Sequence, residues 1–476
     1  MSLAALFRSK PRVVNIGLDS FASELAARGV AVAHVDWRPP AGGKPEIAAL
    51  LAALGAHEKR IARANAQAVR RIVVAEPILE DVMRADQAIP QLGERMLLHA
   101  GPPLSWARMC GPMRGAIAGA IVFEGWAASL AAAARLAASG GVRMLPNHHF
   151  GAVGPMTGIT TRSMPVLVVK NRAKGAGNRA FCTVNEGLGK VMRFGANDAS
   201  VLERLAWLRD EFGPALGAAL RSIGGLELSP LIARGLAMGD EMHQRNVACS
   251  ALTLRALAPA LAKCASSAEV AARALSFIGA NEQFFLNVAM AMGKCMTDPA
   301  RGIEACSLVT AMCRNGTDFG IRVSATGDAW FTAPVELPKG LYFPGYSERD
   351  ANGDMGDSAI VETIGLGAFA MAAAPAVAGF VGAGRASDAQ AYTRAMAEIT
   401  TARNPKWALP PLDMEGVPVG IDVRRVVESG VRPAINTGIA HRKAGVGQVG
   451  AGIARAPLTC FEGALRAFAA TLGVRA

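Results

Sequence analysis

Histidines stand beside glycine-rich turns in this sequence, where they could take part in proton transfer. His148 and His149 precede the run FGAVGPMTG, and His243 lies in the polar stretch MGDEMHQRN. An imidazole in such a setting can polarise a carbonyl group, carry a proton or bind a metal. A pair of hydrogen-bonded turn histidines is an equally good interpretation of His148 and His149.

The stretch MGDEMHQRN also places a carboxylate three residues before its histidine. On a helix, Asp240 and His243 would share one face, and the carboxylate could orient the imidazole. Two ligands do not make a metal site, which needs three or four, and a polar helix start explains the pair equally well. The predicted acid/base residues are therefore His148, His149, His243 and Asp240.

Other glycine-rich stretches carry groups that suit small anions, because backbone amides can approach an anion there. NEGLGKVMRFG resembles a phosphate-binding loop in composition, but G-x-x-x-x-G-K-[ST] is absent, which excludes a Walker-type nucleotide site. We expect Lys190, Arg193 and Arg314 to share one cleft with the predicted acid/base residues. The predicted substrate- and anion-binding residues are Asn185, Glu186, Lys190, Arg193, Arg245, Arg314, Asn315, Asp357, Ser358 and His441.

Several familiar sites are missing from the sequence. It contains no C-x-x-C, EF-hand, nucleophile-elbow, zincin or kinase signature, and the strand–helix–strand segment at its N-terminal end lacks G-x-G-x-x-G. We therefore predict no metal-ligand set and no definite cofactor.

Composition restricts the class of protein. The chain has 476 residues, 51% hydrophobic and 18% charged, which predicts a globular protein of more than one domain. The net charge of +12 comes from dispersed arginines and not from a basic run, so we predict no nucleic-acid partner. Eight cysteines without C-x-x-C pairs favour reduced thiols and a cytoplasmic location. The apolar runs 115–138 and 364–384 are rich in alanine and glycine, which favours buried helices and no membrane span.

The elements that must position these residues follow from periodicity. Strand, helix and strand patterns succeed each other over residues 13–35, and helices are expected over 46–85. Leucines at intervals of three and four predict helices over 200–300, with a kink or break at Gly213-Pro214. The fold class is therefore α+β, with mixed α/β segments flanking a central helical domain. The predicted divisions are a small βαβ-like segment at 1–60, an α/β segment at 61–199, a helical domain at 200–306 and an α/β segment at 307–476.

Long stretches of the chain resemble a known family. HAGPPLSW, CGPMRGA, FEGWA, HHFGAVGPMTGITTRSMP, NEGLGKVMRFG, MGDEMHQRN, AMCRNGTDFGIRVS, WFTAPV, GDMGDSAIVET and NTGIAHRKAGVGQVGAG are similar to the YlbE-like family. The resemblance covers roughly residues 90–470. The segment 12–45 is similar to a tail found on FdrA-like proteins.

The resemblance implies one subunit of an oxamate carbamoyltransferase, at the anaerobic end of allantoin breakdown. Its implied partners are an FdrA-like subunit and a third small subunit. The chain could also form a homo-oligomer. The implied reaction converts oxalurate and phosphate, or a related ureido acid and phosphate, to oxamate and carbamoyl phosphate. No residue roles are carried over from the family.

Two other functions stay open at this point. The chain could be a non-catalytic scaffold or regulatory subunit of such a complex. It could also be a metal-dependent hydrolase of ureido acids that uses His148, His149, Asp240 and His243.

Overall fold

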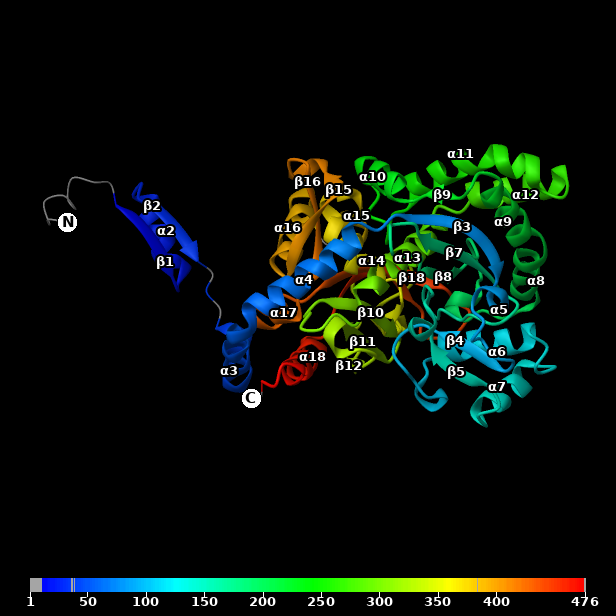
Figure 1. Cartoon of the computed structure of the whole chain (residues 1–476), viewed down its shortest axis with the longest axis horizontal. Coiled ribbons are helices and arrows are strands. Elements are labelled where there is room, and N and C mark those ends of the chain that lie inside the picture. The colour runs from blue at the N-terminus through cyan, green and yellow to red at the C-terminus, as the bar shows by residue number, and fades with distance from the viewer. Residues whose placement is uncertain (1–10, 36, 38, 383, 475–476) are drawn as a thin grey trace, which may run out of the picture.

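A small strand–helix–strand unit stands at the N-terminal end of the chain, apart from the body of the molecule (Figure 1). The structure is a computed structural model and describes residues 11–35, 37, 39–382 and 384–474. Strands β1 (Arg12–Ile16) and β2 (Ala31–Val35) pair in parallel, and helix α2 (Asp19–Ala27) connects them. The predicted order of these three elements is confirmed.

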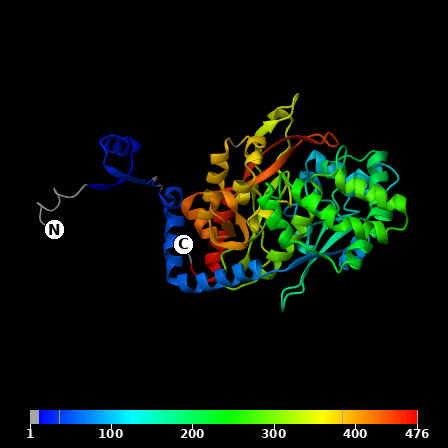
Figure 2. The same ribbon diagram turned by 90° about the horizontal axis from the view of Figure 1, so that it is seen from above.

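Helices α3 (Pro45–Leu54) and α4 (Glu58–Val73) lead from this unit to the body. Figure 2 shows them meeting at a sharp angle along one edge of the molecule. The face of α4 that recurs every three to four residues is buried, as its periodicity predicts. The helices expected up to residue 85 end earlier, however, because β3 (Pro77–Arg84) follows. Pro77 has no amide hydrogen to continue a helix, and the apolar run after it suits a buried strand.

A five-stranded sheet forms the centre of the next segment, in the order β6-β8-β7-β3-β9. Strand β7 (Pro165–Asn171) runs antiparallel to β3. Strands β4 and β5 form a separate parallel pair beside helices α6 and α7 (Figure 1). These two helices contain most of the first of the two alanine-rich apolar runs. The remaining elements are β4 (Met96–His99), β5 (Arg143–Pro146), β6 (Ala152–Val153), β8 (Arg179–Thr183), β9 (Leu226–Glu227), α5 (Ala85–Ala88), α6 (Gly111–Phe123) and α7 (Leu130–Ala138).

The predicted helical segment is confirmed between residues 199 and 297. A wider π-helical turn (Leu208–Phe212) joins α8 to α9 just before Gly213-Pro214, where the sequence predicts a kink or break. Helix α13 is buried at every residue except the half-buried Leu286 and packs against β7 and β8. The helices are α8 (Ala199–Trp207), α9 (Gly213–Ser222), α10 (Ser229–Ala237), α11 (Val247–Cys264), α12 (Ala268–Gly279) and α13 (Phe284–Thr297).

Helix α11 is long and apolar enough to cross a membrane by length and composition, with a mean hydropathy of 1.3. Only 39% of its 18 residues are buried, but the helix packs against α9, α10, α12 and α13. It also carries Arg255, Pro259 and Lys263. These contacts and charges identify α11 as a helix of the folded body.

Three small antiparallel sheets occupy the C-terminal part, in the orders β12-β11-β10-β14, β13-β18-β17 and β15-β16. The second apolar run folds into a buried 3₁₀ turn (Gly367–Ala373) and the half-buried α15. The elements are β10 (Val309–Asn315), β11 (Asp318–Val323), β12 (Phe331–Pro334), β13 (Lys339–Tyr342), β14 (Met355–Gly356), β15 (Thr400–Leu409), β16 (Glu415–Ile421), β17 (Ala434–Ala440), β18 (Gln448–Arg455), α14 (Ile360–Thr363), α15 (Pro375–Phe380), α16 (Ala386–Glu398), α17 (Val423–Ser429) and α18 (Leu458–Thr471).

Two large hydrophobic cores hold the body together. The first takes most of its residues from the five-stranded sheet and the helical segment, with further side chains from α14 and from β15 and β16. The second joins α3 to the C-terminal strands and α18. About 47% of the residues are helical and 22% lie in strands, which confirms the mixed α+β class. The division into four segments stays a prediction.

Candidate functional site

A cleft of about 870 Å³ opens between the helical segment and the C-terminal strands. Gly438 on β17 and Gln448 on β18 form one part of its wall, and the start of α11 and the end of α12 form another. Four of the predicted site residues line it: Asn185, Arg193, His243 and Arg245.

The loop that carries His243 and Arg245 folds around a buried glutamate, Glu241. One carboxylate oxygen accepts the backbone amides of His243 (3.0 Å), Gln244 and Arg245 (2.8 Å). The other oxygen accepts the side-chain amide of Asn436 at 2.9 Å. Burial raises the pKa of Glu241, which His243 and these hydrogen bonds partly oppose. Glu241 therefore fixes the backbone that presents His243 to the cleft.

His243 forms a buried pair with Glu362 of α14. Its Nδ1 lies 2.7 Å from Glu362 Oε1, and the two side chains are 2% and 0% exposed. The same oxygen accepts the backbone amides of Ala368 and Asn436, each at 3.3 Å. Nε2 of His243 makes no hydrogen bond to any residue that the structure describes. A carboxylate on Nδ1 holds the proton there and leaves Nε2 to exchange a proton with a ligand.

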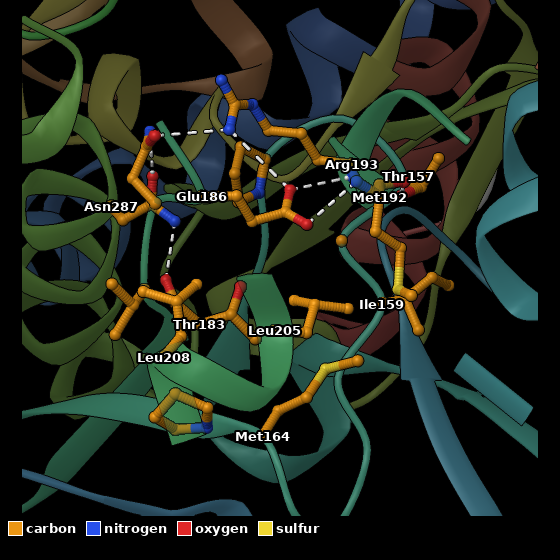
Figure 3. Close-up of a pocket in the computed structure, with 15 residues that line it drawn as sticks. Thr157, Ile159, Met164, Thr183, Glu186, Met192, Arg193, Leu205, Leu208 and Asn287 are labelled. Carbon is orange, nitrogen blue, oxygen red and sulfur yellow. Dashed lines mark hydrogen bonds and ion pairs between the residues drawn. The ribbon is translucent and has the colours of Figure 1, made fainter. Parts of the chain in front are cut away.

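Arg193 lines both the cleft and a second, smaller cavity, and Figure 3 shows it from the side of the smaller cavity. Its guanidinium donates to Asn185 Oδ1 (3.3 Å) and to the carbonyl of Gly187 (2.9 Å), and lies 3.7 Å from Glu186. The Glu186 carboxylate accepts the backbone amides of Met192 (2.9 Å) and Arg193 (3.0 Å). Burial raises the pKa of Glu186 and lowers that of Arg193. Glu186 thus positions Arg193, beside this smaller cavity of about 30 Å³.

Asp240 is separated from His243 by the shape of the loop. The helix expected over 238–246, which would put both residues on one face, is wrong: these residues connect α10 to α11, and Met242 has a φ of 64°. Glu241 explains the difference, because its carboxylate binds backbone amides that a helix would use internally. Asp240 instead accepts the amide of Cys249 at 2.8 Å, near the start of α11, and burial raises its pKa.

Arg245 is the more accessible of the two arginines at the cleft. Its Nε lies 3.5 Å from Asp240, and its side chain is 38% exposed. Neither Nη atom makes a hydrogen bond to a residue within the described ranges. Arg245 can therefore offer a pair of donors to a carboxylate or phosphate.

Arg314 has a different setting, because it is fully buried against Asp354. The two side chains form a bidentate pair with distances of 2.6 and 3.1 Å. Arg314 also donates to the carbonyl of Gly356 (2.8 Å) and to the hydroxyls of Ser358 (3.3 Å) and Thr437 (3.1 Å). All of the donor groups that Arg314 offers are directed at protein partners, so it stands in the framework behind the cleft.

Four further predicted residues lie outside the group that lines the cleft. Asn315 accepts the amides of Thr317 and Asp318 and shapes the turn between β10 and β11. Lys190 is 67% exposed and pairs with Asp198 at 3.2 Å. The other two have local partners: Ser358 with Arg314, and His441, which accepts the amide of Lys443 at 2.9 Å. Their role in anion binding stays a prediction.

His148, His149 and Asp357 form a second polar centre. Asp357 accepts the amides of Gly101 (2.8 Å) and Gly154 (2.9 Å), so it ties two glycine-rich loops together. Burial raises its pKa to about 7. His148 is fully buried on a 3₁₀ turn, and neither of its ring nitrogens has a hydrogen-bond partner. His149 accepts the indole N–H of Trp330 at 2.9 Å.

The expected single cleft therefore collects only part of the predicted set. Arg193 and His243 meet in it, whereas Arg314, His148 and His149 belong to buried or separate surroundings and Lys190 to the surface. Glu241 and Glu362 are missing from the predicted site. Glu362 follows the stretch GDMGDS that contains Asp357, but it meets a histidine 119 positions away, and no local spacing encodes such a contact.

Comparisons with known proteins give a consistent family. Residues 142–358 match the family described as "Oxamate carbamoyltransferase subunit AllG". The Escherichia coli (strain K12) protein of that name is 52% identical over 87% of this chain and 99% of its own length. The uncharacterized protein YahG of the same organism is 42% identical over 99% of both chains. A crystal structure of a conserved protein of unknown function from Enterococcus faecalis V583 superposes with a TM-score of 0.85, at 46% identity, over 87% of this chain and 98% of that one.

Proposed function

The chain belongs to the AllG family of oxamate carbamoyltransferase subunits, and we propose from this premise that its 870 Å³ cleft binds the anionic substrates of carbamoyl transfer. The reaction joins oxalurate, or a related ureido acid, with phosphate to give oxamate and carbamoyl phosphate. The His243–Glu362 pair at the edge of this cleft carries the proposal. Chain and complex act in the cytoplasm.

The chemistry requires one bond to form and one to break. A phosphate oxygen attacks the carbamoyl carbon, and the bond from that carbon to the oxalurate amide nitrogen breaks. The leaving nitrogen must receive a proton as it departs as the amide of oxamate. Nε2 of His243 supplies that proton, while Glu362 holds the ring and stabilises its charged form.

Two arginines provide the anion contacts. Arg193 is fixed by Asn185 and Gly187 and offers a preorganised positive charge in the wall. Arg245, with both Nη atoms free of described partners, binds the carboxylate or the phosphate in bidentate fashion. Holding both reactants against His243 converts an encounter in solution into a reaction between bound neighbours.

Partners complete the proposal. The E. coli relative is named as a subunit, so we propose that this chain also works in a complex. The FdrA-like subunit and the third small subunit implied by the sequence are the proposed partners, and a homo-oligomeric arrangement of this chain is compatible with them. The isolated chain is then expected to convert little oxalurate.

Variants in the reconstituted complex test the proposal. His243→Asn should lower kcat by about 10²- to 10⁴-fold, the usual contribution of a general acid. Glu362→Gln should lower kcat in the same direction, because the amide cannot stabilise a charged imidazole. His57→Asn, at the junction of α3 and α4, is the matched control and should leave kcat unchanged.

A second variant separates binding from proton transfer. Arg245→Gln should raise the KM for phosphate or oxalurate by about 10- to 100-fold, from the loss of one charge-assisted hydrogen bond worth roughly 1.5–3 kcal/mol. Arg273→Gln, an exposed arginine on α12 that pairs with Glu211, should leave KM unchanged. If His243→Asn and Arg245→Gln leave a fully assembled complex as active as wild type, the chain is a non-catalytic scaffold.

A further inference from the structure

We propose that His148, Cys313 and Asp357 form a binding site for a Zn²⁺-type divalent metal ion. One ligand atom from each of the three side chains lies within 4.8 Å of the other two. All three residues are buried. The sequence alone predicts no metal site. The three residues come from the 3₁₀ turn after β5, from β10 and from the segment after β14, so no local spacing in the sequence brings them together.

The hydrogen-bonding state of His148 is the observation that points to a ligand. Its side chain is 0% exposed, and neither Nδ1 nor Nε2 has a hydrogen-bond partner among the residues that the structure describes. Burying an imidazole whose nitrogens have no partner is unfavourable, because the lost hydrogen bonds to water are not replaced. A bound metal ion would satisfy one of the two nitrogens.

The distances fit a metal better than a direct hydrogen bond. Nε2 of His148 lies 3.6 Å from Asp357 Oδ1, which is too long for a hydrogen bond. Zinc binds nitrogen and oxygen at about 2.0–2.2 Å and sulfur at about 2.3 Å, so tetrahedral ligand atoms lie roughly 3.3–3.8 Å from one another. The pair therefore already has the separation that two ligands of one ion require.

The ligand types favour a borderline-soft ion. One imidazole, one thiolate and one carboxylate match the preferences of Zn²⁺ and its neighbours, whereas Mg²⁺ and Ca²⁺ select oxygen atoms alone. Cys313 Sγ makes a weak contact with the carbonyl of Gly320 at 3.7 Å, and no other hydrogen bond within the described part of the chain. Asp357 is oriented by Gly101, Gly154 and Asn147, which supplies the outer hydrogen bonds that metal-binding carboxylates typically have.

The positive groups near the site form ion pairs with two carboxylates. Burial lowers the pKa of His148, and the nearby Lys294 and Arg322 lower it further, which favours the neutral imidazole that a metal ligand requires. Lys294 pairs with Asp298 at 2.6 Å, and Arg322 pairs with Asp328. Arg301 shares both carboxylates, so three cations and two carboxylates lie on this side of the site.

The site has a structural consequence for the cleft. Asp357 accepts the amide of Gly154, and the next residue, Pro155, pairs with Gly356 and lines the cleft. An ion on Asp357 would fasten this wall from behind. Since the metal site and the substrate cleft share no ligand, binding of the ion can be measured without any carbamoyl transfer.

Cobalt provides the direct test on the full-length chain. After treatment with a chelator, wild type should bind one equivalent of Co²⁺ and develop a near-ultraviolet thiolate-to-cobalt charge-transfer band. Cys313→Ser and His148→Ala should each weaken binding by at least about 10- to 100-fold, the loss that even outer-shell changes cause. Cys460→Ser, a buried cysteine of the second core, is the matched control and should bind as wild type does.

A second measurement does not depend on how the variants fold. X-ray absorption of zinc-loaded wild type should show one sulfur ligand among nitrogen and oxygen ligands. Wild type that binds neither Co²⁺ nor Zn²⁺ stoichiometrically, or a charge-transfer band that persists in folded Cys313→Ser, would overturn the site. Failure here would leave the proposed carbamoyl transfer intact, because that function is tested by kcat and KM of His243 and Arg245 variants.

Discussion

Replacing Arg314 should lower the free energy of unfolding without removing any group that lines the cleft. In Arg314→Met, Asp354 keeps its hydrogen bond from Thr437 (2.9 Å) but loses both contacts with the guanidinium. The Asp354 side chain is 2% exposed, so water cannot replace those contacts. Removing one partner of a buried ion pair costs about 3–5 kcal/mol, because it leaves an uncompensated charge.

Urea denaturation followed by circular dichroism measures this loss. Arg403→Met is the matched control, since Arg403 pairs with Glu415 at 2.7 Å while both side chains are well exposed (39% and 51%). An exposed pair contributes about 0–1 kcal/mol, so the control should remain close to wild type.

A double variant identifies the cause of the loss. Arg314→Met with Asp354→Asn removes both charges and should be about 1–3 kcal/mol more stable than the sum of the two single variants predicts. Arg314→Met that loses less than about 1 kcal/mol, or no more than Arg403→Met, would refute the assignment of Arg314 to the framework. In that case Arg314 would return to the list of anion-binding candidates.

Three further expectations concern stability. Burial lowers the pKa of His99 to about 4, so as pH falls the unfolded chain takes up a proton before the folded chain does, and stability is lost between about pH 6.5 and pH 4. The free energy of unfolding should fall by about 1.4 kcal/mol per pH unit at its steepest, and this dependence should flatten in His99→Gln. An equally steep pH dependence in the variant would contradict the assignment. Removal of the first 38 residues should leave the melting temperature of the body unchanged, because Ala22 is the one buried residue of the described N-terminal unit. A lowered melting temperature would show that this unit packs on the body. Gly101→Ala should lower the free energy of unfolding by several kcal/mol, because the new Cβ would lie 2.5 Å from Asn315 Cβ and φ is 83°. Gly302→Ala, whose Cβ would have no neighbour within 4 Å, should cost only about 1–2 kcal/mol of backbone strain. Equal losses in the two variants would argue against the close approach at Gly101.

Periodicity predicted the elements that are decided locally. The leucine spacing of 200–220 and the strand–helix–strand pattern of 13–35 depend on neighbours a few residues apart, and the structure confirms both. The errors occur where distant groups decide. Glu241 turns the expected helix at 238–246 into a loop, partly through Asn436 on β17, and no feature of the local sequence announces that contact.

The candidate site shows the same division between residue type and residue role. Glycine-rich stretches indicated where polar groups gather, and each of the stretches that hold Arg245 and Arg314 also contains an aspartate within five residues of the arginine. Solvent access separates them: Arg245 pairs loosely at 3.5 Å and is 38% exposed, whereas Arg314 is fully buried with five hydrogen bonds to protein groups. A sequence carries no direct record of that difference, because burial depends on strands that come together only in the folded chain.

This division decides how mutational data on such a subunit should be interpreted. Loss of activity alone would place Arg245, His243 and Arg314 in one group, since an unfolded subunit is as inactive as one with an empty site. Arg245, whose side chain is 38% exposed, should change kcat or KM at an unchanged melting temperature, because such a side chain contributes little to the core. His243 is buried against Glu362, so its replacement should lower kcat by more than any accompanying loss of stability explains. A residue of the framework should lower the melting temperature first and activity only in proportion to the unfolded fraction. By this criterion His243 and Arg245 are assigned to the chemistry and Arg314 and Asp354 to the scaffold, and kinetic and thermal measurements on the same four variants decide the assignment.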